Sequence, residues 1–284
     1  MQYVTLSNGI KMRQLGYGVF QIPKEECERW VLDALKVGYR LIDTAQAYQN
    51  EEEVGNAIIK SGIPRKDIFI TTKVAFQNFG YEKTKESVLE SLRKLQTDYI
   101  DLILLHQPFN DYYGAWKALE ELYDQGKLKS IGLSNFSPDR MIDLYVYSRI
   151  KPMVNQVELH PYNQQIESQK WMQQYNVITE AWAPFAQGRN NIFVDPIISS
   201  ISQKYNKSAA KVVLRWEIQR GIVVIPKSVH IDRMKQNFEI FDFILTDDDM
   251  SSIIQLDENK PLFRNQQDPT DAKWFVEVVG KKKK

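Results

Sequence analysis

The chain has 284 residues, 43% hydrophobic and 26% charged, which is the usage of a globular protein and excludes a disordered one. The 37 basic and 36 acidic residues nearly cancel to a net charge of +1, so nothing in the composition predicts a nucleic acid partner. The single cysteine, Cys27, excludes an internal disulfide and a cysteine-based zinc site. Neither a signal peptide nor a run of about 20 apolar residues is visible, so we expect a cytoplasmic protein with no membrane partner and no metal site.

The N-terminus predicts a β-hairpin, because Asn8-Gly9 lies between two β-prone runs, residues 3–6 and 10–12. Eight apolar runs rich in Ile, Val and Leu then predict buried strands at residues 18–20, 40–43, 68–72, 99–105, 130–133, 154–157, 177–181 and 222–225. Segments with helical spacing alternate with them at residues 25–36, 51–60, 81–95, 113–125, 138–147, 167–175, 208–220 and 233–241. This order predicts one domain over residues 1–284, a closed (β/α)8 TIM barrel with an N-terminal β-hairpin.

A doubly wound open sheet is the alternative fold, because it also alternates strands and helices. Three observations favour the barrel: the count of eight, a length near that of known barrels, and the lack of a Gly-x-Gly-x-x-Gly motif after any strand. The run Lys281–Lys284 is interpreted as a solvated tail.

Polar residues follow the predicted strands, at the end of a barrel where active sites lie. Asp43 ends the second strand and Tyr48 follows in its loop, while Lys73 ends the third strand and His106 the fourth. Further along the chain, Ser134, Asn135, Gln156, Trp182, Lys227 and Ser228 occupy the same kind of position.

Four of these residues form a set that suits carbonyl reduction. A carbonyl that accepts a hydride needs a proton donor near its oxygen, and Tyr48 can donate if its pKa is lowered from about 10. The Lys73 ammonium would lower that pKa, and Asp43 would keep Lys73 charged. A neutral His106 would donate a hydrogen bond to the carbonyl oxygen.

Each residue also has a simpler interpretation, and Tyr48 is one of fourteen tyrosines in the chain. Asp43 could be a cap or turn residue, Lys73 a surface lysine at a strand tip, and His106 a core histidine. His160 and His230 are interpreted as structural. The four together are much harder to explain in this way than any one alone.

The sequence resembles the aldo-keto reductases in several separate blocks. These are residues 38–45 with Tyr48, residues 131–136, residues 155–158 with His160-Pro161, and residues 225–229 with Arg233 and Asn237. The block Ala181-Trp182-Ala183-Pro184-Phe185 is similar to that of prokaryotic 2,5-diketo-gluconate reductases and aldehyde reductases.

The resemblance implies a (β/α)8 barrel that binds NADPH without a Rossmann motif, and a monomer that reduces a small carbonyl substrate. It implies Tyr48 as general acid, Lys73 and Asp43 as its tuning pair, and His106 as the group that orients the carbonyl. For the nicotinamide half of the cofactor, it implies that Ser134, Asn135 and Gln156 bind the carboxamide and that Trp182 stacks on the ring. For the adenosine half, it implies that Lys227, Ser228 and Arg233 bind the 2′-phosphate and that Gln236 and Asn237 contact the adenine. The other residues implied in the cofactor site are Gly18, Val19, Ala183, Pro184, Phe185 and Val229.

The sequence departs from the family in the substrate pocket, where Phe20, Ala75 and Gln107 stand in place of the tryptophans of many relatives. The expected substrate-binding residues are Phe20, Tyr48, His106 and Gln107. Loss of two indoles at Ala75 and Gln107 predicts a wider pocket with one more polar wall.

Two other functions stay open at this point. Lys73 could form a Schiff base in an aldolase-type lyase, although Asp43 beside it would raise the pKa of the lysine and oppose this. The barrel could also bind NADPH as a regulatory protein with little turnover.

Overall fold

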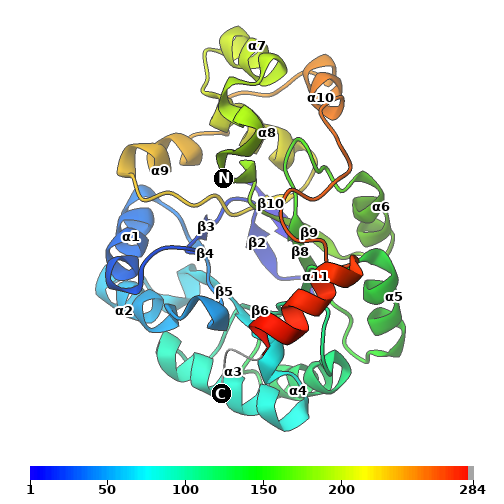
Figure 1. The fold of residues 1–284 in the computed structure, drawn as a ribbon. Coiled ribbons are helices and arrows are strands. Elements are labelled where there is room, and N and C mark those ends of the chain that lie inside the picture. The colour runs from blue at the N-terminus through cyan, green and yellow to red at the C-terminus, as the bar shows by residue number, and fades with distance from the viewer. Residues whose placement is uncertain (281–284) are drawn as a thin grey trace.

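The computed structural model describes residues 1–280, and its centre is a ring of eight parallel strands (Figure 1). They are β3 (Tyr17–Gly18), β4 (Leu41–Asp43), β5 (Phe69–Val74), β6 (Leu102–Leu105), β7 (Ile131–Ser134), β8 (Val154–Glu158), β9 (Ile178–Trp182) and β10 (Val223–Val224), paired in chain order. A parallel bridge between Leu15 and Val224 closes the ring, with Gly16 N donating to Val224 O at 2.8 Å. The predicted barrel is therefore confirmed, and the open sheet is wrong.

Eight helices follow the strands and surround the ring in Figure 1. They are α1 (Lys24–Val37), α2 (Glu51–Ser61), α3 (Tyr81–Leu95), α4 (Tyr112–Asp124), α5 (Pro138–Tyr147), α6 (Ile166–Gln174), α8 (Ala209–Gln219) and α9 (Ile231–Phe238). All eight correspond to predicted segments. The largest error is at α9, which begins two residues before the predicted 233 and ends three before 241.

The structure contains helices that the spacing analysis missed. These are α7 (Pro196–Tyr205), α10 (Asp247–Ile254) and α11 (Pro269–Trp274), with the short helices η1 (Gln46–Tyr48), η2 (Arg65–Asp67), η3 (Phe76–Asn78), η4 (Ala186–Val194) and η5 (Phe275–Val279). Cap signals for two of them are present in the sequence. Asp195 accepts hydrogen bonds from the N–H groups of Ile197 and Ile198 at the start of α7, and Thr246 and Asp249 form a capping box on α10.

An antiparallel hairpin, β1 (Tyr3–Thr5) and β2 (Lys11–Arg13), precedes the barrel and packs against side chains of its strands. Leu6 and Met12 of this region belong to one apolar cluster with the strand residues Leu41, Leu102, Leu104, Val154 and Val223. A second, larger cluster fills the space between strands and helices. The part of the barrel interior next to the hairpin is therefore lined by apolar side chains.

Gly132 on β7 shows how closely the strands approach. A Cβ atom at this position would lie 2.6 Å from the carbonyl oxygen of Val154 and 2.8 Å from the Leu104 side chain. No larger residue fits there without moving β8, which explains a glycine in an otherwise apolar strand.

None of the helices in the described part of the chain is long and apolar enough to cross a membrane. The predicted tail Lys281–Lys284 lies outside the described residues. The assignment of residues 1–284 to one domain stays a prediction.

Met12→Ala tests the role of the hairpin as the floor of the barrel. Met12 is fully buried, so its truncation should leave a cavity and lower the free energy of unfolding by about 2–5 kcal/mol. Urea denaturation measures this, with Ile59→Ala as control because that side chain is 57% exposed on α2. Equal losses in the two variants would show that the hairpin does not seal the barrel.

Candidate active site

Three of the four predicted catalytic side chains meet at the carboxyl end of β4 and β5. The Lys73 Nζ donates to Asp43 Oδ1 at 2.6 Å and Oδ2 at 2.8 Å, and to the Thr44 carbonyl oxygen at 2.9 Å. It also lies 3.3 Å from the Tyr48 hydroxyl. Lys73 has no exposed side-chain surface, so its ammonium group depends on these partners instead of water.

His106 completes the group from the next strand. Its ring centroid lies 5.8 Å from that of Tyr48, and the two rings meet edge to face. The backbone of His106 is fixed on both sides, because its N–H donates to Val74 O at 3.2 Å and its carbonyl accepts from Asn135 Nδ2 at 3.0 Å. The four residues predicted from separate strand ends therefore share one mouth of the barrel.

Gln46 fixes the loop that carries Tyr48, a role that the sequence analysis missed. Its Oε1 accepts from Ala75 N at 3.0 Å and its Nε2 donates to Ser87 O at 3.1 Å, which ties η1 to the end of β5 and to α3. Gln49 then turns the chain in a left-handed conformation, with φ 60°. These contacts hold the phenol over Lys73.

The charges of the site follow from burial and from the ion pair. Burial lowers the pKa of Lys73, but the Asp43 carboxylate and Tyr48 raise it more, so the lysine stays protonated. Burial raises the pKa of Tyr48, and although Lys73 lowers it as expected, the net direction is upward. Burial and the Lys73 charge lower the pKa of His106 to about 3, so its imidazole is neutral at neutral pH.

Glu180 is a further charged residue of this region that the sequence analysis did not assign to the site. It lies on β9 with no exposed surface, and burial followed by repulsion from Asp43 raises its pKa to about 8. A glutamate inside an otherwise apolar predicted strand, residues 177–181, was the signal that could have found it.

Residues predicted to hold a nicotinamide lie beside the four catalytic residues. Asn135 donates to Ser134 Oγ at 3.1 Å and accepts from the Trp182 indole N–H at 2.9 Å. Gln156 Nε2 donates to Asp43 Oδ2 at 2.9 Å. The ends of β7, β8 and β9 thus bring an indole and three polar side chains to the same mouth.

Asn135 and Ala183 both occupy the left-handed region, with φ 64° and 53°. Each follows the last residue of its strand, β7 or β9, so the backbone turns sharply where the cofactor was expected. Pro184 and Phe185 continue this turn after β9, and the Phe185 ring packs on Phe193 at 5.6 Å.

The predicted phosphate and adenine residues lie farther along, after β10 and on α9. Lys227, Arg233 and Gln236 are exposed, Val229 is partly buried, and Ser228 and Asn237 are buried. Ser228 Oγ accepts from His230 N at 3.1 Å, and the Ser228 carbonyl accepts from the Tyr17 hydroxyl at 2.6 Å. Within residues 1–280, Lys227 and Arg233 take part in no ion pair, so two cations face solvent near one buried turn.

Gly18 and Val19 contribute backbone to the barrel, since Gly18 N donates to Pro226 O at 3.2 Å and Val19 N donates to Asp43 O at 3.1 Å. A Cβ at Gly18 would lie 2.9 Å from the Ile225 carbonyl oxygen, so β3 and β10 approach closely there. The Val19 side chain is fully buried, and its carbonyl accepts from Asn50 Nδ2 at 3.2 Å.

Two of the expected substrate residues, Phe20 and His106, pack on the Tyr48 ring. The Phe20 ring is 46% exposed and lies 4.9 Å from the Tyr48 ring. Gln107 Oε1 accepts from Gln266 Nε2 at 3.2 Å, and Phe275 packs on Phe109 at 5.3 Å. The segment after α10 therefore contacts the loop after β6 at Gln107 through Gln266, a residue that the sequence analysis missed.

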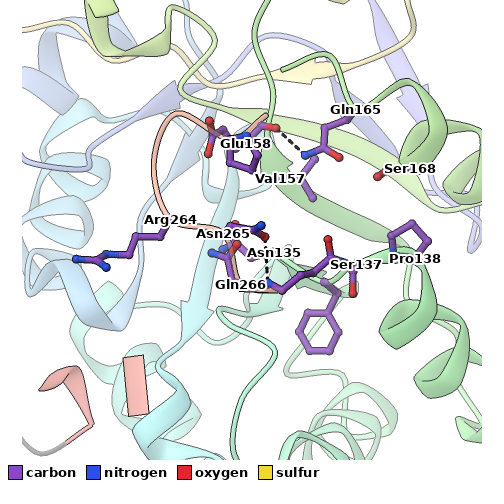
Figure 2. Close-up of a pocket in the computed structure, with 13 residues that line it drawn as sticks. Asn135, Ser137, Pro138, Val157, Glu158, Gln165, Ser168, Arg264, Asn265 and Gln266 are labelled. Carbon is purple, nitrogen blue, oxygen red and sulfur yellow. Dashed lines mark hydrogen bonds between the residues drawn. The ribbon is translucent and has the colours of Figure 1, made fainter. Parts of the chain in front are cut away.

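A separate cavity of about 80 Å³ lies between this C-terminal segment and the loops after β7 and β8. Figure 2 shows Ser137, Gln165 and Arg264 around it, and Asn135 is its only residue from the predicted site. Glu158 Oε1 accepts from Leu262 N at 2.6 Å, which anchors the segment beside the cavity.

Comparison with known proteins agrees with this geometry. The model described as Aldo/keto reductase family matches residues 9–258. The chain is 42% identical over 262 residues to methylglyoxal reductase DkgA of Escherichia coli (strain K12), across 91% of this chain and 94% of that protein. It is 44% identical over 259 residues to glyoxal reductase of Bacillus subtilis (strain 168), across 90% of this chain and 93% of that protein.

Among solved structures, a Gox0644 mutant in complex with NADPH is 37% identical, with a TM-score of 0.88 over 93% of this chain and 97% of that one. The resemblance seen in the motifs around Asp43, Asn135 and Lys227 is confirmed by these matches. The chain belongs to the aldo/keto reductase family.

Proposed function

We propose that the protein is an NADPH-dependent oxidoreductase that reduces aldehydes or ketones to alcohols, with Tyr48 as the proton donor. The observation that carries the proposal is the Lys73 ammonium, which contacts both the Asp43 carboxylate and the Tyr48 hydroxyl inside a mouth shared with His106. The relatives named methylglyoxal reductase and glyoxal reductase support a small, reactive carbonyl as the substrate.

The residues at the mouth fit NADPH in two places. Trp182 offers an indole whose orientation is fixed by Asn135, and an aromatic face is a suitable surface for a nicotinamide ring. Lys227 and Arg233, free of carboxylate partners among the described residues, suit the dianionic 2′-phosphate that distinguishes NADPH from NADH. The solved Gox0644 mutant with bound NADPH supports the same cofactor here. When bound, NADPH supplies the hydride.

The side chains of the chain then control the substrate oxygen and the proton. Neutral His106 donates a hydrogen bond that fixes the direction of the carbonyl oxygen. Tyr48 transfers its proton to that oxygen as negative charge develops on it. The Lys73 ammonium stabilises the resulting phenolate, and Asp43 keeps the ammonium charged and directed at the phenol.

The lyase alternative is less consistent with the site. A Schiff base requires a lysine that is neutral at working pH, whereas Asp43 and Tyr48 raise the pKa of Lys73. A regulatory barrel that binds NADPH without turnover is the other alternative. The proposed enzyme would lower the absorbance of NADPH when aldehydes are added, whereas the regulatory protein would not.

The proposal also covers the preferred substrates, the oligomeric state and the location of the enzyme. Gln107, paired with Gln266, places amide groups where many relatives have an indole, which favours polar carbonyl compounds over large aromatic ones. A monomer in the cytoplasm is the expected form, and the one cysteine, Cys27, is buried and forms no disulfide within the chain.

Tyr48→Phe tests the proton donor. The variant removes one hydroxyl, so kcat for a reactive aldehyde should fall by about 10²-fold or more because general acid catalysis is lost. The Kd for NADPH, measured by quenching of protein fluorescence, should stay within about twofold. Tyr147→Phe is the matched control, since that ring is 79% exposed on α5. Full activity in the Tyr48→Phe variant would remove Tyr48 from the mechanism.

Arg233→Ala tests the choice of NADPH over NADH. Loss of a charged hydrogen-bond donor to the 2′-phosphate should raise the Kd for NADPH by about 10- to 100-fold and leave the weak binding of NADH unchanged. Lys235→Ala, on the same exposed helix α9, serves as control for general changes in surface charge. Equal effects on the two dinucleotides would place Arg233 away from the phosphate.

A further inference from the structure

Glu180 is a buried carboxyl group inside the barrel with no assigned role. It has no exposed surface, and within the described residues neither of its side-chain oxygens has a hydrogen-bond partner. A carboxylate without partners is costly to bury, so such a group favours its neutral form. Burial and the nearby Asp43 charge raise its pKa to about 8, against the opposing effects of the Lys73 charge and of the neighbouring Gln156 amide, whose Nε2 donates to Asp43 and not to Glu180.

A short series of contacts connects the strand of Glu180 to the proton donor. Glu180 on β9 is the register partner of Gln156 on β8. Gln156 Nε2 donates to Asp43 Oδ2 at 2.9 Å, and Asp43 holds the Lys73 ammonium that contacts Tyr48.

Among residues 1–280, few charged or titratable groups act on Glu180. Asp43 from β4 and Lys73 from β5 act directly on it, and its own charge acts on Tyr48 in η1. His106 after β6 is neutral. The two strands that flank β9 place Gln156 and Val223 in register with Glu180, and neither side chain ionises. The protonation of Glu180 therefore sets how many negative charges lie near Lys73.

We propose that Glu180 is a positioning residue of this site, which acts through Asp43 and Lys73 on the acidity of Tyr48. In its neutral form it leaves the Lys73 ammonium with a single carboxylate partner. When it ionises and releases its proton to solvent, it adds a second negative charge near Lys73 and makes Tyr48 a weaker acid. The inference rests on the proposed function, since it concerns the proton that Tyr48 donates.

The direction of the pH effect follows from the charge. Below about pH 8 Glu180 is neutral and the Lys73 ammonium acts on Tyr48 with little opposition. As the pH rises through about 8, the added carboxylate raises the pKa of Tyr48, so proton donation slows and kcat/KM for reduction falls.

The test compares pH profiles of kcat/KM for the wild type, Glu180→Gln and Glu217→Gln. Glutamine has nearly the shape of protonated glutamate but cannot ionise, so the alkaline fall of Glu180→Gln should move upward by about one pH unit or more. Glu217 on α8 is the matched control, because it is also fully buried with two unpartnered oxygens and a pKa raised by burial. Its variant should keep the wild-type profile.

A second measurement uses the protein without cofactor or substrate. Since the folded pKa of Glu180 is raised from 4.5 to about 8, the stability it confers is fully present below about pH 4.5 and is lost as the pH rises to about 8. The Tm of Glu180→Gln relative to the wild type should therefore rise between pH 5 and about pH 8. Glu217→Gln should show the same trend in Tm without the change in kinetics.

The outcomes separate cleanly. A shifted alkaline limb in Glu180→Gln alone, together with the Tm trend, supports the proposal. An unchanged limb in an active Glu180→Gln enzyme overturns it, whatever the Tm trend. A wild type that reduces no carbonyl compound at any pH counts against the proposed function itself. If Glu180→Gln does not fold, Glu180→Met provides a second uncharged side chain of similar length for the same comparison.

Discussion

The buried ammonium of Lys73 is the constraint on which the site depends. Removing such a charge from water costs several kcal/mol, and the cost is offset only where partners with good geometry surround it. Asp43 supplies two oxygens within 2.8 Å and Thr44 a backbone carbonyl at 2.9 Å. Both partners come from the end of β4. The pairing of β4 with β5 therefore places them beside the Lys73 ammonium.

The apolar interior of the barrel strengthens the ion pair between Lys73 and Asp43. Below the ion pair lies an apolar floor made by Met12, Leu41 and Leu104, sealed by the hairpin β1–β2. Gln156 donates to Asp43 Oδ2 at 2.9 Å, and the partly buried Trp182 donates to Asn135 at 2.9 Å. A charge pair in such a low-dielectric setting acts on its neighbours far more strongly than it would in water. The same burial that raises the pKa of the Tyr48 phenol therefore amplifies the lowering effect of Lys73 on it.

Much of the site could be predicted from sequence because parallel strands end at a common edge. Asp43 and Lys73 lie at the ends of buried strands and His106 directly follows one, so their convergence needs only the topology. Glu180 and Gln46 could not be assigned in this way. Glu180 lies within a strand, and Gln46 acts by fixing the loop that carries Tyr48. The contact of Gln266 with Gln107 depends on where the C-terminal segment crosses the barrel, and no local sequence pattern predicts that path. The helices α7 and α10, by contrast, carry readable cap signals at Asp195 and Thr246 that spacing alone did not detect.

Chemistry and selectivity are carried by different parts of the fold. Asp43, Lys73 and His106 lie at strand ends, and the loop of Tyr48 is tied to the barrel by Gln46. By contrast, Gln107 belongs to a loop and Gln266 to a segment after α10. Replacing an indole by an amide at Gln107 alters a wall of the pocket without touching the contacts of Lys73. Such a division allows the substrate range to change while the ion pair stays intact, because loops tolerate substitution that a buried charge does not. Glu180 belongs to the barrel side of this division, so its effect should fall on proton transfer and not on the choice of substrate.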